Sequence, residues 1–197
     1  GGYVRFWGQP LAQARSRIAY VPQRETVDWD FPVTVMDVVR MGATSKLGWF
    51  QRGGKREREL ALRSLDRVGL ADFSSRQIGK LSGGQQQRVF LARALAREAD
   101  IYLLDEPMAG VDEGSQEQIF NILSGLRDQG KLVVAVHHDI RTAVEWFDAV
   151  ALIDMRLVAA GPTAEILTPE NLTMTYSGRL SVLDEIGEAV ERGGRTS

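Results

Sequence analysis

The chain has 197 residues, of which 44% are hydrophobic and 25% charged, a composition that supports one large globular domain with a substantial core. Its net charge of −2 gives no basis for nucleic-acid binding, and the absence of cysteine excludes disulfides and thiolate metal ligands. No apolar run approaches the roughly 18 residues that cross a bilayer, and we expect no secretory signal because the first residues lack a basic region followed by an apolar one.

Apolar runs bounded by turn residues predict short strands, and apolar residues at helical spacing predict helices. Thr34 with Asp37 three positions later predicts one helix start, and Gly69 and Gly130 predict two helix ends. In chain order we expect strands over 3–6 and 18–21, a loop over 23–32, a helix over 33–41, a surface excursion over 42–55, helices over 56–68 and 85–96, a strand over 101–104, a helix over 115–129, a strand over 132–136, a helix over 141–147, and a hairpin of strands 150–153 and 157–160.

The alternation of strands and helices predicts the fold class. Strands without polar alternation, separated by helices, are typical of a parallel sheet covered on both faces. The closing hairpin is expected to turn near Met155, and the segment 181–197 starts with a helical pattern and ends as a frayed tail.

The segment 81–85, Leu-Ser-Gly-Gly-Gln, predicts a helix that begins beside two glycines. Ser82 and Gln85 form a capping box, while Gly83 and Gly84 leave their backbone N–H groups open to close approach. Exposed N–H groups at a helix N-terminus bind anions, so a phosphate site is one interpretation. An ordinary glycine turn that caps a helix is the other.

Two adjacent acids follow the apolar run 101–104. Ligands of an open parallel sheet bind outside the carboxyl ends of its strands, where Asp105 could hold Mg²⁺ and Glu106 could polarise an attacking water. Adjacent residues point to opposite sides of a strand, so the two carboxylates suit different tasks. A solvated acidic turn is the alternative, and it is the better one for a lone Asp-Glu-Pro.

Polar residues also follow two other apolar runs. His137 and His138 come after 132–136, where a histidine can donate a hydrogen bond to a phosphate oxygen. A surface pair or a metal site are the alternatives, although a shared metal is disfavoured because adjacent side chains diverge. Gln23 follows the run that ends at Val21, and a lone Gln in a loop usually has no function.

The order and spacing of these segments together resemble the ABC ATPase family. The resemblance covers nearly the whole chain and is weakest after about residue 168. The matches are Gln23 at the Q-loop glutamine, 81–85 at the signature motif, 101–106 at the Walker B motif with Glu106 at the general-base position, 110–112 at the D-loop, and His138, before Asp139, at the switch histidine.

The resemblance implies an α/β fold with a P-loop NTPase-like parallel sheet core and a helical subdomain that carries the signature motif. It places an ABC ATPase domain over 1–180, with the helical subdomain over about 33–98, and a C-terminal tail over 181–197. The family's P-loop pattern, Gly-x-x-x-x-Gly-Lys-[Ser/Thr], occurs nowhere in the sequence. Because there is also no initiating Met, we expect that the chain lacks the first strands and the P-loop, which amount to very roughly 40–50 residues. We expect the loss to expose apolar sheet surface.

For the complete subunit the resemblance implies hydrolysis of ATP with Mg²⁺. It implies that Asp105 organises Mg²⁺, directly or through water, and that Gln23 senses Mg²⁺ and the attacking water. It implies that Glu106 orients this water and that His138 contacts the γ-phosphate.

The resemblance also implies a head-to-tail pair of nucleotide-binding subunits, most simply a homodimer. ATP lies between the P-loop of one subunit and the signature motif of the other. The residues implied to meet the partner's nucleotide are Ser82, Gly83, Gly84 and Gln85, and Asp112 is implied to communicate across the dimer.

Within the family, the chain looks like the importers of manganese, zinc and iron, in the stretches 27–35, 41–42, 47–50, 77–79 and 85–94. This branch implies a membrane permease as a partner and a cytoplasmic position, peripheral on the inner face of the cell membrane. The large aromatics Trp29, Phe31, Trp49 and Phe50 suit an interface with the permease or, equally, the core. The sequence does not name the transported ion, and no nucleic-acid partner is expected.

Two other functions stay open at this point. A soluble ABC ATPase that remodels nucleic acid or ribosomes is expected to carry a second cassette, long coiled-coil insertions or a basic patch. A chain naturally without a P-loop would supply only a signature face to a partner and have no ATPase activity of its own. The intact Glu106 and His138 argue against such decay.

Overall fold

The computed structural model describes residues 3–23, 32–44 and 54–176, and the chain divides into two compact units, 1–136 and 137–197. The expected tail over 181–197 lies outside the described residues, as do the aromatic residues Trp29, Phe31, Trp49 and Phe50. The expected domain bounds stay a prediction.

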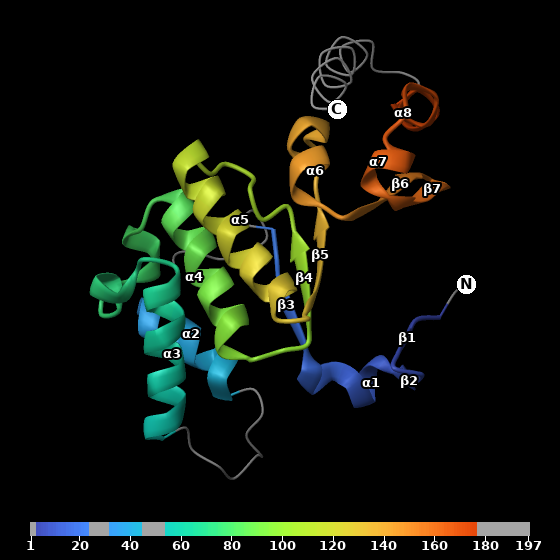
Figure 1. Ribbon diagram of the computed structural model, residues 1–197. Coiled ribbons are helices and arrows are strands. Elements are labelled where there is room, and N and C mark those ends of the chain that lie inside the picture. Colours follow the sequence, from blue (N-terminus) through green and yellow to red (C-terminus); the bar gives the residue numbers. More distant parts are fainter. Residues whose placement is uncertain (1–2, 24–31, 45–53, 177–197) are drawn as a thin grey trace. The chain divides into compact units, whose positions relative to one another are not determined.

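The first unit alternates strands and helices largely as the sequence predicts (Figure 1). The short elements β2 and α1 are additions that the sequence patterns do not predict. The strands are β1 (Arg5–Phe6), β2 (Gln9–Pro10), β3 (Ile18–Val21), β4 (Ile101–Asp105) and β5 (Leu132–Val136). The α-helices are α1 (Leu11–Ala14), α2 (Val35–Ala43), α3 (Lys55–Arg67), α4 (Gly83–Ala96) and α5 (Glu113–Asp128), and short 3₁₀ helices cover Arg15–Arg17, Ala71–Phe73 and Ile78–Lys80.

Local capping chemistry sets several helix boundaries. Before α2, the Thr34 hydroxyl accepts from the Asp37 N–H at 3.2 Å, and the Thr34 N–H donates to the Asp37 carboxylate at 3.1 Å. Gly69 and Gly130 follow α3 and α5 with φ of 67° and 74°, a conformation that glycine adopts without strain. The expected capping box and helix ends are therefore confirmed.

The expected parallel sheet is present, in the order β3-β4-β5. Its register places Ile18 beside Ile101 and Ile101 beside Leu132. Side chains alternate between the two faces of a sheet, and one face is covered because α4 packs on β3 and α5 packs on β5. The buried residues of that face are Ala19, Val21, Tyr102 and Leu104.

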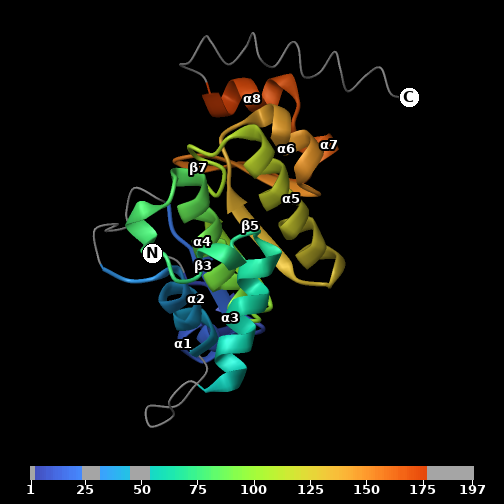
Figure 2. The same ribbon diagram turned by 90° about the vertical axis from the view of Figure 1, so that its left-hand side faces the viewer.

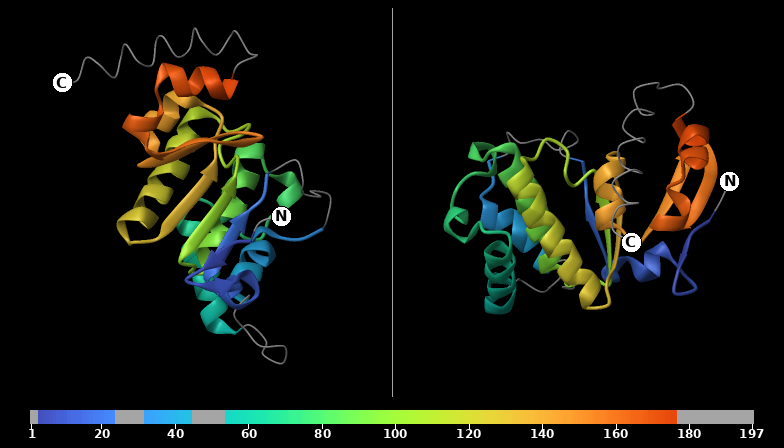
Figure 3. Two further views of the ribbon diagram at one scale, coloured as in Figure 1. Left: turned by 90° about the vertical axis from the view of Figure 1, so that its right-hand side faces the viewer. Right: turned by 45° about the horizontal axis from the view of Figure 1, so that its top comes forward.

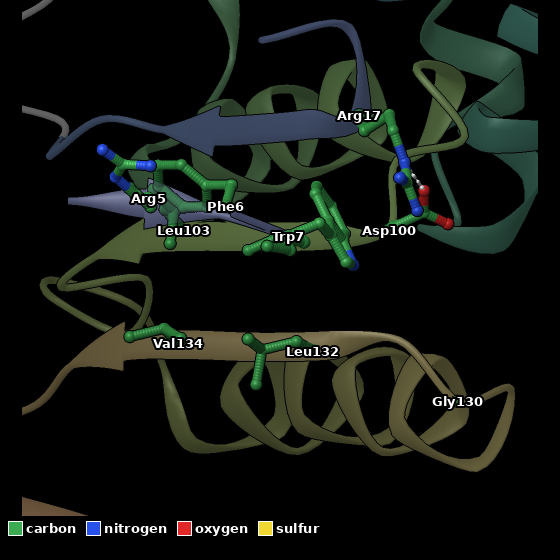
Figure 4. A pocket seen from close by; sticks show the side chains of 10 residues that line it. Arg5, Phe6, Trp7, Arg17, Asp100, Leu103, Gly130, Leu132 and Val134 are labelled. Atoms are coloured by element: carbon green, nitrogen blue, oxygen red, sulfur yellow. Dashed lines mark hydrogen bonds and ion pairs between the residues drawn. The ribbon is translucent and has the colours of Figure 1, made fainter. Parts of the chain in front are cut away.

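The opposite face of this sheet is covered only in part, where Ile18 and Ile101 are buried against Ala14 and Phe6. Tyr20, Leu132, Val134 and Val136 on it are 54%, 53%, 48% and 56% exposed. Figure 4 shows part of this face, where Leu132 and Val134 line a hollow of about 560 Å³ together with Trp7. The expectation of a sheet covered on both faces is thus met only in part on this face, and apolar sheet surface is exposed over the rest of it, as expected.

An ionic cluster joins the amino ends of the three sheet strands. Asp100, which precedes β4, accepts from Arg17 Nε at 2.7 Å and from Lys131 Nζ at 2.9 Å. Its backbone N–H donates to the Arg17 carbonyl at 2.8 Å, and its carbonyl accepts from the Leu132 N–H at 3.0 Å. Trp7 stacks on the Arg17 guanidinium at 3.6 Å, as Figure 4 shows beside Asp100. These contacts hold the strands in one register.

Helices α2, α3 and α4 pack against one another, as Figure 2 shows. Helices α2 and α4 approach each other closely at Gly42, where a Cβ atom would lie only 1.9 Å from the carbonyl oxygen of Arg93. Gly42 is therefore the residue that allows the backbones of these two helices to touch.

The second unit is described over 137–176 and has a hairpin with helices against it (Figure 3). The turn falls at Met155 as expected, with φ of 53°. Leu152 and Leu172 form its small core, in which α8 packs on β6 and α7 packs on β7. Its elements are α6 (Ile140–Trp146), β6 (Ala149–Asp154), β7 (Arg156–Pro162), α7 (Thr163–Ile166) and α8 (Pro169–Tyr176).

We predict that Gly42→Ala lowers the free energy of unfolding by about 2 kcal/mol, because the added methyl group forces α2 away from α4. The matched control is Gly125→Ala in α5, where a Cβ atom meets nothing within 4 Å. That change is expected to raise stability by up to about 1 kcal/mol. Urea denaturation followed by circular dichroism measures both, and equal effects would contradict the close helix contact.

We predict that Asp100→Asn lowers stability at pH 7 by less than about 1 kcal/mol, since the ion pairs are partly exposed. Hydrogen bonds from Lys131 and Arg17 lower the pKa of the Asp100 carboxyl in the folded protein. Its contribution is therefore present above the unfolded-state pKa of about 3.9 and is lost as pH falls through the lower folded-state value. Denaturation between pH 7 and pH 2 should show the difference from wild type shrinking with acid. Asp128→Asn, which removes a more exposed carboxylate, is the control.

Candidate functional site

The carboxyl edge of the sheet brings together two predicted site residues that lie 83 positions apart. The register that aligns Val21 with Leu104 places the ends of β3 and β4 side by side. Gln23, two residues beyond β3, donates from Nε2 to the Glu106 carboxylate at 3.1 Å. An amide that holds a carboxylate in this way leaves the second carboxylate oxygen available to a water or a ligand.

Asp105 is the last residue of β4 and faces the open side of the sheet. Its carboxylate lies 3.5 Å from the hydroxyl of Tyr20 on β3, a long and weak contact. The backbone carbonyl of Tyr20 accepts from Arg93 Nη2 on α4 at 3.4 Å. Sequence reasoning missed Tyr20. The alternation of side chains along a strand is the sequence signal that could have found it. In the register of β3 with β4, Tyr20 and Asp105 lie on the same face of the sheet.

Glu106 has a left-handed backbone, with φ of 45°. Its carbonyl accepts from the Ala109 N–H at 3.1 Å, so the chain turns sharply as it leaves β4. For a residue with a Cβ atom, this conformation costs roughly 1–2 kcal/mol. The turn sends the Glu106 side chain towards Gln23, while Asp105 stays on the strand.

The expected capping box at the start of α4 is present. The Ser82 N–H donates to Gln85 Oε1 at 3.0 Å, and the Gln85 N–H donates to Ser82 Oγ at 3.3 Å. These bonds place Gly83 and Gly84 in the first turn of α4, where N–H groups lack partners within the helix. The first turn therefore has the geometry of an anion site.

Asp112 lies beside this helix start. Its carboxylate caps α5 by accepting from the Ser115 N–H at 3.0 Å, and hydrogen bonds from Ser115 lower its pKa. A Cβ atom on Gly84 would lie 3.5 Å from the same carboxylate, so the starts of α4 and α5 are neighbours.

His138 is an exposed residue of the second unit, between β5 and α6. The contacts thus join Gln23 with Glu106 and Gly84 with Asp112.

The donor set at the sheet edge suits a hard cation that keeps other ligands. Asp105 is half-exposed and offers carboxylate oxygens, the ligands that Mg²⁺ prefers. Within 3–23, 32–44 and 54–176, no group of three or more acids or histidines gathers as a closed metal cage. Across the same ranges, no helix has both the length and the apolar character needed to span a membrane.

Comparisons with known proteins agree on the family. Residues 1–109 match the ABC transporter family model. The zinc transport system ATP-binding protein TroB of Treponema pallidum is 49% identical over 180 residues, which cover 91% of this chain and 68% of that protein. The manganese transport system ATP-binding protein MntB of Bacillus subtilis is 48% identical over 184 residues, which cover 93% and 74%.

Solved structures agree as well. A metal-chelate type ABC transporter in an inward-facing conformation superposes with a TM-score of 0.75 at 30% identity, over 82% of this chain and 64% of that one. A dimeric ATP-binding cassette with bound ADP and phosphate superposes with a TM-score of 0.67 at 30% identity, over 78% and 66%. The chain thus spans about two thirds of the length of these proteins.

The chain belongs to the ABC transporter family of ATP-binding subunits. Its fold is that of the ABC ATPases, with the parallel sheet and the helix layer of the nucleotide-binding domain. The relatives reported above are the ATP-binding subunits of zinc and manganese transport systems.

We predict that Glu106→Gly raises the free energy of unfolding by about 0.5–1 kcal/mol, because glycine adopts the left-handed conformation without strain. Glu98→Gly is the matched control, since Glu98 has φ of 49° just after α4 and carries no proposed function. Thermal or urea unfolding measures both variants. A loss of stability at position 106 alongside a gain at position 98 would mean that contacts of Glu106 outweigh its backbone strain.

Proposed function

We propose that this chain carries the hydrolytic residues of the ATPase subunit of an importer for transition-metal ions, of the manganese and zinc type. The observation that carries the proposal is the hydrogen bond from Gln23 to Glu106 at the carboxyl edge of β4. It joins the two residues that the family resemblance matches to the Q-loop glutamine and to the general base. The identities of 48–49% to manganese and zinc transport ATP-binding proteins support the choice of cargo.

In the proposed reaction, Glu106 orients a water and accepts its proton as the water oxygen attacks the γ-phosphorus of ATP. The new P–O bond forms while the bond from the γ-phosphorus to ADP breaks. Gln23 donates a hydrogen bond to the Glu106 carboxylate and contacts the same water. Asp105 fits as the ligand of Mg²⁺, which neutralises phosphate charge when bound. His138 donates a hydrogen bond to the γ-phosphate.

The start of α4 serves a second subunit in this proposal. N–H groups of Gly83 and Gly84, ordered by the Ser82–Gln85 capping box, bind the γ-phosphate held by the partner. Asp112 lies against Gly84 and so can transmit the state of that contact to α5. ATP closes the pair and hydrolysis releases it. A homodimer is the simplest arrangement.

We propose a membrane permease as the other partner, and a peripheral position on the cytoplasmic face of the membrane. The relatives that are ATP-binding proteins of zinc and manganese transport systems support such an assembly. The 197 residues contain no P-loop pattern. The activity is therefore proposed for the subunit that combines this chain with a P-loop, and experiments use the complete open reading frame.

We predict that Glu106→Gln in the complete subunit lowers ATP hydrolysis by at least about 100-fold, because the amide cannot accept the proton of the water. ATP binding should stay within a few-fold of wild type. Glu113→Gln, an exposed residue of α5, is the matched control. Steady-state phosphate release and equilibrium nucleotide binding measure the two effects.

Near-normal turnover of Glu106→Gln would exclude the general-base role. The cargo is tested separately, by uptake of manganese and zinc in cells that lack the subunit and are complemented with wild type or Glu106→Gln. Restored uptake with wild type alone supports the importer. Unchanged uptake of both ions in the deletion strain would exclude this cargo while leaving the ATPase assignment intact.

A further inference from the structure

His137 lies next to the proposed phosphate-sensing residue His138 and is anchored to α6. Its Nε2 atom lies 2.6 Å from the hydroxyl oxygen of Thr142, in the first turn of that helix. The Thr142 hydroxyl lies 3.3 Å from the carbonyl oxygen of Asp139, the N-cap residue of α6. Through Thr142, these contacts connect both residues that flank His138 to the first turn of α6.

The chemistry of this set assigns the proton between His137 and Thr142. A carbonyl oxygen only accepts, so the single hydroxyl proton of Thr142 points to Asp139. With that proton directed to Asp139, the hydroxyl oxygen is the acceptor for His137, which corresponds to the tautomer with a proton on Nε2. The His137 ring is therefore a donor that ties the residue before His138 to α6.

Ring packing also holds the His137 side chain. The centroid of the His137 ring lies 5.9 Å from that of Trp146 and 5.5 Å from that of Phe147. His137 and both of these partners are half-buried. On the far side of the link, Asp139 caps α6 by accepting from the Arg141 N–H at 2.9 Å.

The exposed His138 thus sits between two anchored neighbours. Its ring lies 6.1 Å from the His137 ring and is tilted by 32°. The direction of a side chain is set by its backbone. The backbone of His138 is held on both sides, by the contacts of His137 and of Asp139. Errors of about 1 Å in such a position cost up to about 100-fold in rate.

We infer that His137 and Thr142 form a clamp that positions His138 towards the γ-phosphate, with His137 as a positioning residue and not a ligand of the nucleotide. The inference rests on the proposed function. It assigns the two adjacent histidines different tasks: one donates within the protein, and the other donates to the nucleotide.

The test is steady-state ATP hydrolysis and nucleotide binding by the complete subunit with Thr142→Val, which keeps the shape and removes the hydroxyl. We expect kcat to fall about tenfold while KM for ATP changes by less than about twofold, because only orientation is lost. Thr142→Ser should restore kcat. Thr175→Val is the matched control, since the Thr175 hydroxyl also bonds a backbone carbonyl in a helix of the same unit.

The histidine itself is tested by two substitutions. His137→Gln retains an N–H donor near the position of Nε2 and should keep kcat within about threefold, whereas His137→Phe retains a ring without a donor and should lose about tenfold. Nitrogen NMR of the His137 ring is expected to show a protonated Nε2 atom. An unprotonated Nε2 atom, or equal activities of the two variants, would overturn the clamp.

Failure of the clamp and failure of the proposed function give different results. If His138→Ala leaves hydrolysis intact, the role of His138 in the proposed function is wrong. If His138→Ala abolishes hydrolysis but Thr142→Val behaves like Thr175→Val, the clamp alone is wrong. In the His138→Ala background, Thr142→Val should add less than about a twofold loss, and a full additional tenfold loss would show that Thr142 does not act through His138.

Discussion

The parallel hydrogen bonding of β4 with β3 on one side and β5 on the other is the interaction on which the site depends. Because β4 is central, one register aligns the carboxyl ends of three strands that are distant in the chain. Gln23 reaches Glu106 only through that alignment. At the opposite ends of the same strands, Asp100 binds both Arg17 and Lys131, so a shift of any strand would break ionic contacts as well as backbone ones.

Helix α4 links the two groups of proposed functional residues. Most of its residues are buried, and it packs against α2, α3 and β3. Its first turn presents Gly83 and Gly84, while near its other end Arg93 donates to the backbone of Tyr20, which lies beside Asp105. One helix therefore spans from Gly83 and Gly84 to the strand before Gln23. The tight contact at Gly42 fixes α2 to it.

Features with a local cause could be predicted from the sequence, and features that depend on long-range packing could not. The capping boxes at Thr34 and Ser82 and the turn at Met155 follow from neighbouring residues, and each was located correctly. The parallel sheet followed from the pattern of apolar runs. Which face of the sheet is open, how closely Gly42 approaches Arg93, and the contact between Tyr20 and Asp105 depend on register and helix docking. Gln23 carried no local signal, and only its place in the family pattern singled it out.

The strained backbone of Glu106 sets conformational stability against the chemistry proposed for this residue. With φ of 45°, the position favours glycine or asparagine on conformational grounds alone. A sequence with glutamate at this position therefore bears a conformational cost. If Glu106 has its proposed role, this position is the first to drift in a lineage released from the need to hydrolyse nucleotide, ahead of buried neighbours such as Leu104 that the core still constrains. The identity of residue 106 across related sequences is thus a test of the hydrolytic role proposed for Glu106.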